Sequence, residues 1–210
     1  MDTRAVIFDF GGVICFPPTE QQLSAAAALC GLSTAEFLRA FWLKRGEYDR
    51  GQDAVSYWQD IGVAAGRSYD SETIAELVRR EIEFWTRFDT RVLRWAAQLR
   101  ASGLRTGILS NLPRPLGEAL RATPGFLDHF DHVTFSYELG VIKPEREIYR
   151  HAIEGVGAAP EQTLFLDDRA DNVEGGRATG LQALLFTTWE HFVARDCARF
   201  GLPEPPRRAP

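Results

Sequence analysis

The chain has 210 residues, of which 45% are hydrophobic and 25% charged, and its formal net charge is −5. This length and apolar content suit one domain with a modest insertion, and they exclude a disordered or fibrous chain. The acidic balance argues against nucleic acid or an anionic membrane as a partner, so a small molecule is the expected partner.

The three cysteines, Cys15, Cys30 and Cys197, are far apart and form no C-x-x-C pair. Neither a disulfide framework nor a zinc site is therefore predicted. No apolar run approaches the roughly 20 residues of a membrane-spanning helix, and the first residues lead into a strand-like run instead of a signal peptide. We expect a cytoplasmic protein.

Short apolar runs rich in β-branched and aromatic residues recur along the chain and predict buried parallel strands. They lie at residues 5–10, 106–109, 133–136, 163–166 and 183–187. Helical periodicity fills the segments between the later runs, which predicts a doubly wound α/β sheet. The first connection, from Phe10 to Ile108, far exceeds the about 30 residues of a βαβ crossover, so an insertion is expected there.

The insertion, residues 18–87, carries only helical signals and predicts an all-helical cap subdomain. Ser33 or Thr34 is expected to cap one of its helices and Ser71 another. The α/β core is then expected to comprise residues 1–17 and 88–200. Residues 201–210 are rich in proline and are expected to form a flexible tail.

Polar side chains close three of the predicted strands, at the sheet edge where open α/β proteins bind their ligands. One of only two lysines in the chain begins the helix after a fourth strand. Oxygen ligands suit Mg²⁺, and a lysine together with backbone N–H groups beside glycines suits a phosphate. The sequence therefore predicts a site for both, built from Asp9, Gly11, Gly12, Ser110, Asn111, Lys143, Asp167 and Asp168.

These motifs, in this order, resemble the haloacid dehalogenase superfamily of hydrolases, in the phosphatase-like branch with a helical cap between the first two motifs. The matching segments are VIFDFGGV at 6–13, ILSN at 108–111, GVIKPEREIY at 140–149 and FLDDRADN at 165–172. KRGE at 44–47 and NVEGGRATG at 172–180 are also similar to the bacterial α-glucose-1-phosphate phosphatases. The resemblance implies a Rossmann-like core, a Mg²⁺-dependent phosphatase, a small phosphorylated substrate such as a sugar phosphate, and a monomer or homodimer.

The resemblance also implies a role for each matching residue. Asp9 would attack phosphorus and form an aspartyl phosphate that water then hydrolyses. Asp9, the carbonyl group of Gly11, and Asp168 would bind Mg²⁺, with Asp167 and Asn172 behind them. Ser110 and Lys143 would hold the transferring phosphoryl group, and the remaining phosphate contacts would come from Phe10, Gly11 and Asn111.

One position departs from the family pattern. Family phosphatases usually carry a second aspartate two residues after the nucleophile as a general acid, and this chain has Gly11 there. Because a positioned proton donor contributes roughly 10² to 10⁴ in rate, an ordinary alkyl phosphate is expected to be a poor substrate. Three alternatives follow: a good leaving group such as an anomeric or aryl phosphate, an acid supplied by the cap, or a non-catalytic phosphate-binding module.

Glu47, Tyr48 and Asp49 are the candidates for a cap acid, although an exposed polar turn is the favoured interpretation of these residues. Substrate specificity is expected to depend on cap residues, for which Trp42, Arg45, Glu47 and Tyr48 are the candidates.

A 2-haloacid dehalogenase is a further alternative, since it uses the same aspartate on carbon and also lacks the second one. The adjacent Asp167 and Asp168 oppose it, because they would repel a carboxylate substrate. The segment that contains His129 and His132 is interpreted as a solvated loop before the third strand and not as a metal site.

Overall fold

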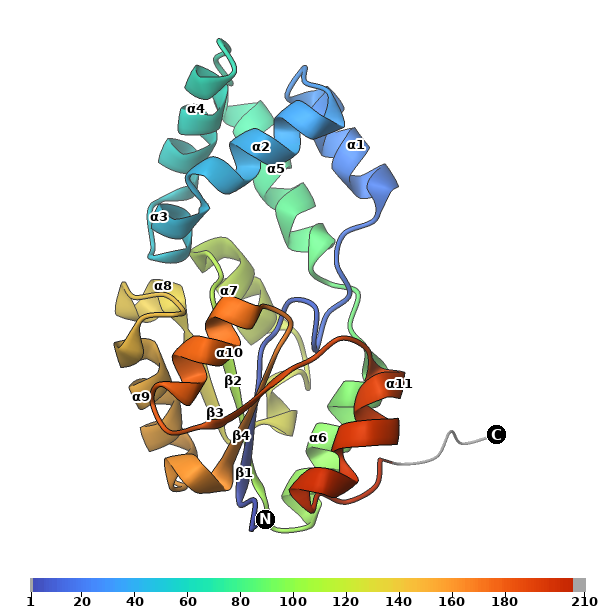
Figure 1. Cartoon of the computed structure of the whole chain (residues 1–210). Helices are drawn as coiled ribbons and strands as arrows, with labels where there is room; N and C mark the ends of the chain where they lie inside the picture. Colours follow the sequence, from blue (N-terminus) through green and yellow to red (C-terminus); the bar gives the residue numbers. More distant parts are fainter. Residues whose placement is uncertain (1, 206–210) are drawn as a thin grey trace.

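A five-stranded parallel sheet runs through the lower part of the molecule in Figure 1, in the order β3-β2-β1-β4-β5. The structure is a computed structural model that describes residues 2–205. The doubly wound α/β fold predicted from the sequence is confirmed, with strand ends shifted by a few residues. The strands are β1 (Ala5–Phe8), β2 (Arg105–Ser110), β3 (His132–Phe135), β4 (Thr163–Asp167) and β5 (Gln182–Leu185).

β1 lies at the centre of the sheet, where it pairs in parallel with β2 and β4. Val6 and Phe8 face one buried cluster, while Ala5 and Ile7 face another on the opposite side of the sheet. Both faces are covered, which explains why this strand is an unbroken apolar run. The carboxyl ends of the three strands lie next to one another, and the chain segments that follow them meet at one edge of the sheet.

Helices cover both faces of the sheet (Figure 1). Apolar residues of α6 and α7 belong to the same buried cluster as Val6 and Phe8, and those of α9 and α10 to the cluster of Ala5 and Ile7. The core helices are α6 (Thr90–Ala101), α7 (Arg114–Ala122), α8 (Ser136–Leu139), α9 (Arg146–Val156), α10 (Ala170–Arg177) and α11 (Trp189–His191). Shorter helical segments lie at Leu127–His129, Pro160–Gln162, Phe192–Asp196 and Ala198–Phe200.

Five helices between β1 and β2 stand above the sheet (Figure 1). They enclose a buried cluster of their own, rich in aromatic residues such as Phe37, Tyr57 and Trp58. Because this cluster is separate from the core clusters, we propose that residues 18–87 form a cap unit. The helices are α1 (Glu20–Leu29), α2 (Thr34–Leu43), α3 (Arg45–Asp49), α4 (Ala54–Ala64) and α5 (Ser71–Phe84).

Side chains at the helix starts define the ends of the cap helices. Ser33 forms a capping box with Glu36 at the start of α2, which decides between Ser33 and Thr34. The prediction that Ser71 caps α5 is wrong by one residue. The side chain of Asp70 accepts the Thr73 N–H at 2.8 Å, so Asp70 is the cap and Ser71 is the first helical residue.

The two connections between cap and core run side by side. Phe16 N–H donates to the Arg87 carbonyl at 2.9 Å, and Asp89 N–H donates to the Ile14 carbonyl at 2.8 Å. A second link joins α3 to the core, where Ser136 Oγ donates to the Asp49 carbonyl at 2.5 Å. The cap is therefore attached at its base and also through α3.

The predicted flexible tail is wrong for residues 201–205. Leu202 is buried in a core cluster, and Trp95 Nε1 donates to the Pro203 carbonyl at 3.0 Å. The proline content of this segment suggested a flexible tail, but the burial of Leu202 and the hydrogen bond from Trp95 attach it to the core. Residues 206–210, the rest of the predicted tail, lie outside the described residues.

The three cysteines are buried and unpaired with one another. Within residues 2–205, every helix falls short of the length and apolar character needed to cross a membrane.

Candidate active site

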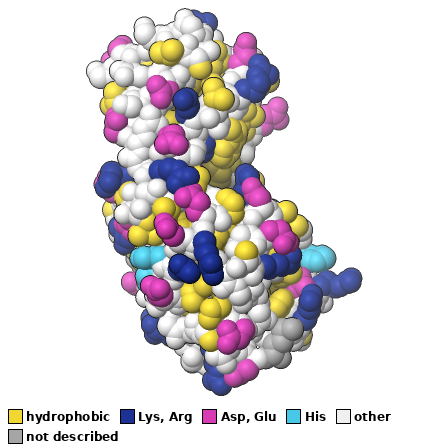
Figure 2. All heavy atoms as spheres, turned by 60° about the vertical axis from the view of Figure 1, so that its left-hand side comes forward, with side chains coloured by type: hydrophobic (Ala, Val, Ile, Leu, Met, Phe, Trp, Pro, Cys, Tyr) yellow, Lys and Arg dark blue, Asp and Glu magenta, His cyan; other side chains and the backbone are white. Residues whose placement is uncertain are grey.

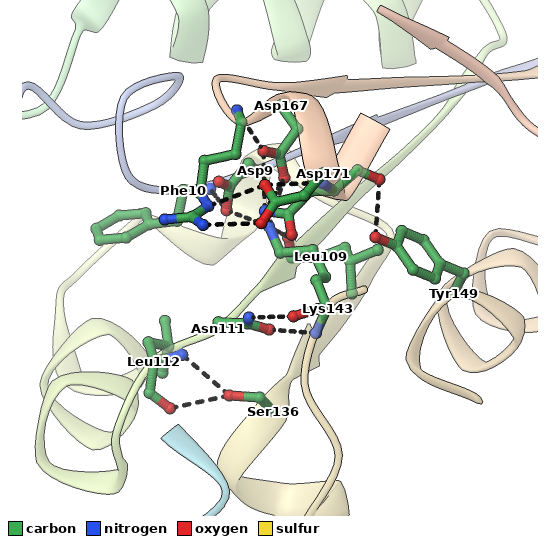
Figure 3. A network of polar contacts seen from close by, with 12 residues as sticks. Asp9, Phe10, Leu109, Asn111, Leu112, Ser136, Lys143, Tyr149, Asp167 and Asp171 are labelled. Atoms are coloured by element: carbon green, nitrogen blue, oxygen red, sulfur yellow. Dashed lines mark hydrogen bonds and ion pairs between the residues drawn. The ribbon is translucent and has the colours of Figure 1, made fainter. Parts of the chain in front are cut away.

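A cavity of about 640 Å³ lies between the carboxyl edge of the sheet and the cap. Its floor includes Asp9 after β1, Ser110 at the end of β2, Lys143 before α9, and Asp168 after β4. Figure 3 shows Asp9, Lys143 and Asp167 close together, joined by polar contacts. The sheet topology thus brings together residues that are widely separated in the sequence.

Lys143 is the centre of the polar network on this floor. Its side chain is buried, with the residue 3% exposed, and Nζ lies 2.8 Å from Asp9 Oδ1 and 2.7 Å from Asp167 Oδ2. Nζ also donates to the Leu109 carbonyl at 3.1 Å. Burial opposes the charge, but Asp167 and Asp9 outweigh it and hold the pKa of Lys143 above its ordinary value.

Asp9 uses one carboxylate oxygen for its protein contacts. Oδ1 accepts the Phe10 N–H at 2.6 Å and pairs with Lys143 Nζ, so Oδ2 is the oxygen left for chemistry. Burial raises the pKa of Asp9 to about 7, while Lys143 opposes the rise and Asp167 adds to it. A cation bound here would favour the ionised carboxylate, which is the form that attacks phosphorus.

Asp167 is fully buried, and both of its oxygens are occupied. Oδ2 pairs with Lys143, Asn172 Nδ2 contacts both oxygens at 3.0 and 3.1 Å, and Arg169 N–H donates to Oδ1 at 2.9 Å. This saturation suits the predicted place of Asp167 and Asn172 behind the metal ligands. Asp168 follows directly and lines the cavity.

The carboxylates fit a divalent cation. Ligand atoms of Asp9, Asp167 and Asp168 lie within 4.8 Å of one another. Lys143 offsets one of these three negative charges, and adjacent carboxylates repel unless a cation stabilises them. Hard oxygen donors of this kind are typical Mg²⁺ ligands.

Glycine is required at position 12. Gly12 has φ +75°, and a Cβ there would lie 2.4 Å from Asp168 Oδ2. The turn after β1 therefore approaches Asp168 more closely than any side chain would allow.

Two predicted phosphate contacts are already engaged. The Phe10 N–H donates to Asp9, and the Phe10 ring packs against Phe88 and Phe126. The Asn111 side chain accepts the Lys143 N–H at 2.7 Å and donates to the Lys143 carbonyl at 3.0 Å. Asn111 thus positions the segment that carries Lys143, and Ser110 lines the cavity floor.

The cap contributes a second buried ionic cluster. Arg45 Nε donates to Asp49 Oδ1 at 2.8 Å, and Arg45 NH1 donates to Glu81 Oε1 at 2.5 Å. Arg45 and Asp49 line the cavity. The prediction of an exposed polar turn at residues 47–49 is wrong for Tyr48 and Asp49, which are buried in the short helix α3.

The cap residues predicted to set specificity divide into two groups. Trp42 and Arg45 line the cavity. Glu47 is exposed, whereas Tyr48 is buried and stacks on Tyr57 with ring centroids 3.9 Å apart, so neither is among the cavity-lining residues.

Sequence reasoning missed two cap residues, Glu81 and Trp85. Glu81 lies in the apolar stripe of α5 between Leu77 and Phe84, and a carboxylate in such a position signals a buried partner. Trp85 lines the cavity, and its indole edge would lie 3.3 Å from a Cβ at Gly11. No sequence signal indicates this approach, because it depends on how the cap sits on the core.

The prediction of a solvated loop is wrong for His132. This residue begins β3, and its Nε2 lies 3.1 Å from Thr134 Oγ1 and 3.5 Å from His151 Nδ1. His129 lies in the short helical segment before the strand. Neither histidine belongs to the metal-compatible group found in residues 2–205.

The comparisons with known proteins agree with this geometry. The sequence model of the haloacid dehalogenase-like hydrolase family matches residues 3–180. The sesquiterpene phosphatase astK of Aspergillus oryzae is 26% identical, over 88% of this chain and 90% of its own length. The D-ribitol-5-phosphate phosphatase of Bacteroides thetaiotaomicron is 29% identical, over 85% and 89%. A magnesium complex of a HAD family enzyme from Bacteroides thetaiotaomicron has the same fold, with TM-score 0.73 and 19% identity over 91% of this chain and 98% of that one.

Proposed function

The chain belongs to the haloacid dehalogenase-like hydrolases, and we propose that it is a Mg²⁺-dependent phosphatase that forms an aspartyl phosphate on Asp9. The observation that carries the proposal is the cluster of Asp9, Asp167 and Asp168 around buried Lys143. Both curated relatives compared above are named as phosphatases, which supports the same class of reaction here.

The proposed reaction has two steps. Asp9 Oδ2 attacks phosphorus, the bond to the leaving oxygen breaks, and that oxygen departs with the electron pair. Water then attacks the aspartyl phosphate and passes its proton to the solvent, the bond between phosphorus and Asp9 breaks, and phosphate leaves with the carboxylate restored. Ser110 holds the phosphoryl oxygens. Lys143, whose three N–H groups contact Asp9, Asp167 and the Leu109 carbonyl, fixes the Asp9 side chain through Oδ1 and places its positive charge beside the phosphoryl group.

Mg²⁺ held by Asp9, Asp168 and the Gly11 carbonyl would offset the charge that develops on the phosphoryl oxygens. Asp167 and Asn172 support this set because their hydrogen bond fixes the loop that carries Asp168. A neighbouring HAD fold binds magnesium in its solved complex, which supports the choice of cation.

The position of the family's general acid has no proton donor for the leaving group, because Gly11 has no side chain. Asp49 is the cap candidate that lines the cavity. Burial raises its pKa, yet Arg45 Nε lies 2.8 Å from its Oδ1 and favours the ionised form. We therefore favour a leaving group that departs without full protonation.

The dehalogenase alternative has less support. The floor carries Asp167 and Asp168 beside Asp9, and a substrate carboxylate would meet these charges. For a phosphate substrate, the cation that these carboxylates bind would offset their negative charge.

The test is phosphate release from phenyl phosphate with and without Mg²⁺. We expect Mg²⁺-dependent turnover that Asp9→Asn lowers by at least about 10³-fold. Asp128→Asn, an exposed position outside the site, is the matched control and should keep the native rate. Phosphate binding without release would instead support the non-catalytic module, and chloride release from a 2-chloroacid would support the dehalogenase.

A further inference from the structure

The cavity has two chemically different ends. Charged groups gather at the sheet edge, where the phosphate is proposed to bind. The opposite wall consists of cap residues, and most of them are apolar. In Figure 2 a hollow separates the upper and lower parts of the molecule, with hydrophobic side chains along its upper edge. The apolar wall is formed by Pro17, where the chain leaves the core, and by the cap residues Pro18, Leu23, Leu38, Phe41, Trp42, Phe84 and Trp85.

The charged groups on the cap wall are already paired. Arg45 donates to Asp49 at 2.8 Å and to Glu81 at 2.5 Å. Its guanidinium also lies 5.0 Å from the ring centre of Phe41 and 5.7 Å from that of Trp42. Two N–H groups of Arg45 and one carboxylate oxygen of Asp49 are therefore engaged within the cap.

A polyol is a poor match for such a wall. Each hydroxyl group would lose hydrogen bonds to water on entering, and the proline, leucine and phenylalanine side chains of the wall return none, which costs roughly 1 to 3 kcal/mol for each group on the scale of protein substitutions. An apolar group of similar size gains free energy from the same burial.

Trp42 also favours an apolar ligand over a polyol. Its side chain lines the cavity although the residue is 52% exposed. An indole in this position keeps apolar surface in water until a ligand covers it.

The position of the missing general acid is apolar as well. At Gly11, where a general acid would stand in a family phosphatase, the indole edge of Trp85 faces the backbone. A leaving oxygen of low basicity needs no proton there, and the oxygen of an aryl ester has that property.

We propose that the cavity takes phosphate monoesters with a hydrophobic, aryl-type leaving group and discriminates against polyol phosphates. This inference rests on the proposed phosphatase function and names its substrate class.

A series of 4-alkylphenyl phosphates tests the inference, since alkyl length changes burial with little change in the basicity of the leaving oxygen. From phenyl through methyl and ethyl to propyl, kcat/KM should rise about three- to fourfold per added carbon. The 4-(2-hydroxyethyl)phenyl ester matches the propyl ester in size and should fall about tenfold or more below it.

Two neighbouring residues provide matched variants. Trp42 lines the cavity, whereas Leu43 is 67% exposed and is not among the cavity-lining residues. Trp42→Ala should flatten the dependence on alkyl length, while Leu43→Ala should keep the native slope. A slope that survives Trp42→Ala and disappears in Leu43→Ala would place the apolar contact elsewhere and overturn the inference.

The outcomes separate the inference from the proposed function. Mg²⁺-dependent turnover of phenyl phosphate with a flat alkyl series, or faster turnover of glucose 1-phosphate than of the propyl ester, overturns the substrate class and leaves the phosphatase intact. If no ester turns over, the phosphatase fails, and binding of the same series to Asp9→Asn, followed by tryptophan fluorescence, decides the inference. Affinity that rises with alkyl length supports it, and equal affinity overturns it.

Discussion

Two buried ionic clusters face the same cavity, one from the core and one from the cap. In each, a single basic side chain lies between two carboxylates: Lys143 contacts Asp9 and Asp167, and Arg45 contacts Asp49 and Glu81. Burial is nearly complete in both. Contact distances of 2.7 and 2.8 Å in the core, against 2.5 and 2.8 Å in the cap, do not distinguish them.

The clusters differ in how many carboxylates surround the single basic side chain. In the cap cluster both carboxylates pair with Arg45, whose guanidinium also lies against the Phe41 ring. The core cluster has a third carboxylate, Asp168, with ligand atoms within 4.8 Å of those of Asp9 and Asp167, and within residues 2–205 Asp9 Oδ2 has no hydrogen-bond or ion-pair partner. The core cluster thus has three carboxylates to one basic group, against two to one in the cap, and this larger excess of negative charge suits it to bind a cation.

The largest effect should follow the loss of Lys143. Lys143→Met leaves Asp9 and Asp167 buried without their counter-ion, so we expect a loss of about 3 to 5 kcal/mol in the free energy of unfolding. Phosphatase activity should fall by at least about 10³-fold. Urea unfolding and phosphate release measure the two effects.

Lys44→Met provides the control, since Lys44 is the other lysine and is exposed. Equal stability of the two variants would contradict the central place of Lys143 in the core cluster.

Arg45→Met should be comparably costly to stability but not to the chemical step. The buried carboxylates of Asp49 and Glu81 lose their partner, and we expect a loss of about 3 to 5 kcal/mol by urea unfolding. At a temperature where the variant is folded, kcat for phenyl phosphate should fall less than about tenfold. Arg39→Met, an exposed position on α2, is the control. A loss of kcat as large as that of Lys143→Met would erase the distinction between the clusters.

An intermediate effect is expected at Gly12, which lets the turn approach Asp168. Gly12→Ala forces Asp168 away from a Cβ that would lie 2.4 Å from its Oδ2, so Mg²⁺ affinity should fall about 10- to 100-fold in a calorimetric titration. Gly66→Ala is a close control, because Gly66 also has a positive φ, +65°, but nothing lies within 4 Å of an added Cβ. Equal Mg²⁺ affinity in the two variants would remove Asp168 from the metal site.

The smallest effect should come from Asp49. Asp49→Asn keeps an acceptor for Arg45, and if the leaving group needs no proton, kcat for aryl phosphates should change less than about threefold. A loss of 10² to 10⁴-fold that grows with the basicity of the leaving oxygen would instead identify Asp49 as a general acid supplied by the cap. Rates for phenyl phosphates with ring substituents of different electron demand measure this dependence.

The core cluster could be predicted from the sequence, and the cap cluster could not. Asp9 and Asp168 follow buried strands, and Ser110 ends one. Because parallel strands place their carboxyl ends at one edge of the sheet, predicting the strands was enough to predict that these residues lie close together. Arg45 of α3 contacts Glu81 of α5, and periodicity does not specify which residues of different cap helices meet. The exposed turn expected at residues 47–49 was wrong because a short helix buries Asp49 against Arg45.

The sequence also does not show which partner a polar or aromatic side chain contacts. Asn111 stands next to Ser110, as a phosphate ligand would, yet its amide spends both ends on the Lys143 backbone. The approach of Trp85 to Gly11 joins two residues far apart in the chain across the junction of cap and core. Such contacts depend on the relative placement of whole units.

The most direct test of the account is to find the phosphoryl group on the enzyme. The protein would be mixed with phenyl phosphate and Mg²⁺, quenched in acid within milliseconds, reduced with borohydride and digested for mass spectrometry. The account predicts that Asp9 is reduced to homoserine, which marks an acyl phosphate at that carboxyl group, and that omission of Mg²⁺ or the Asp9→Asn substitution abolishes the product. Turnover without reduction at Asp9, or reduction at another carboxylate, would contradict it.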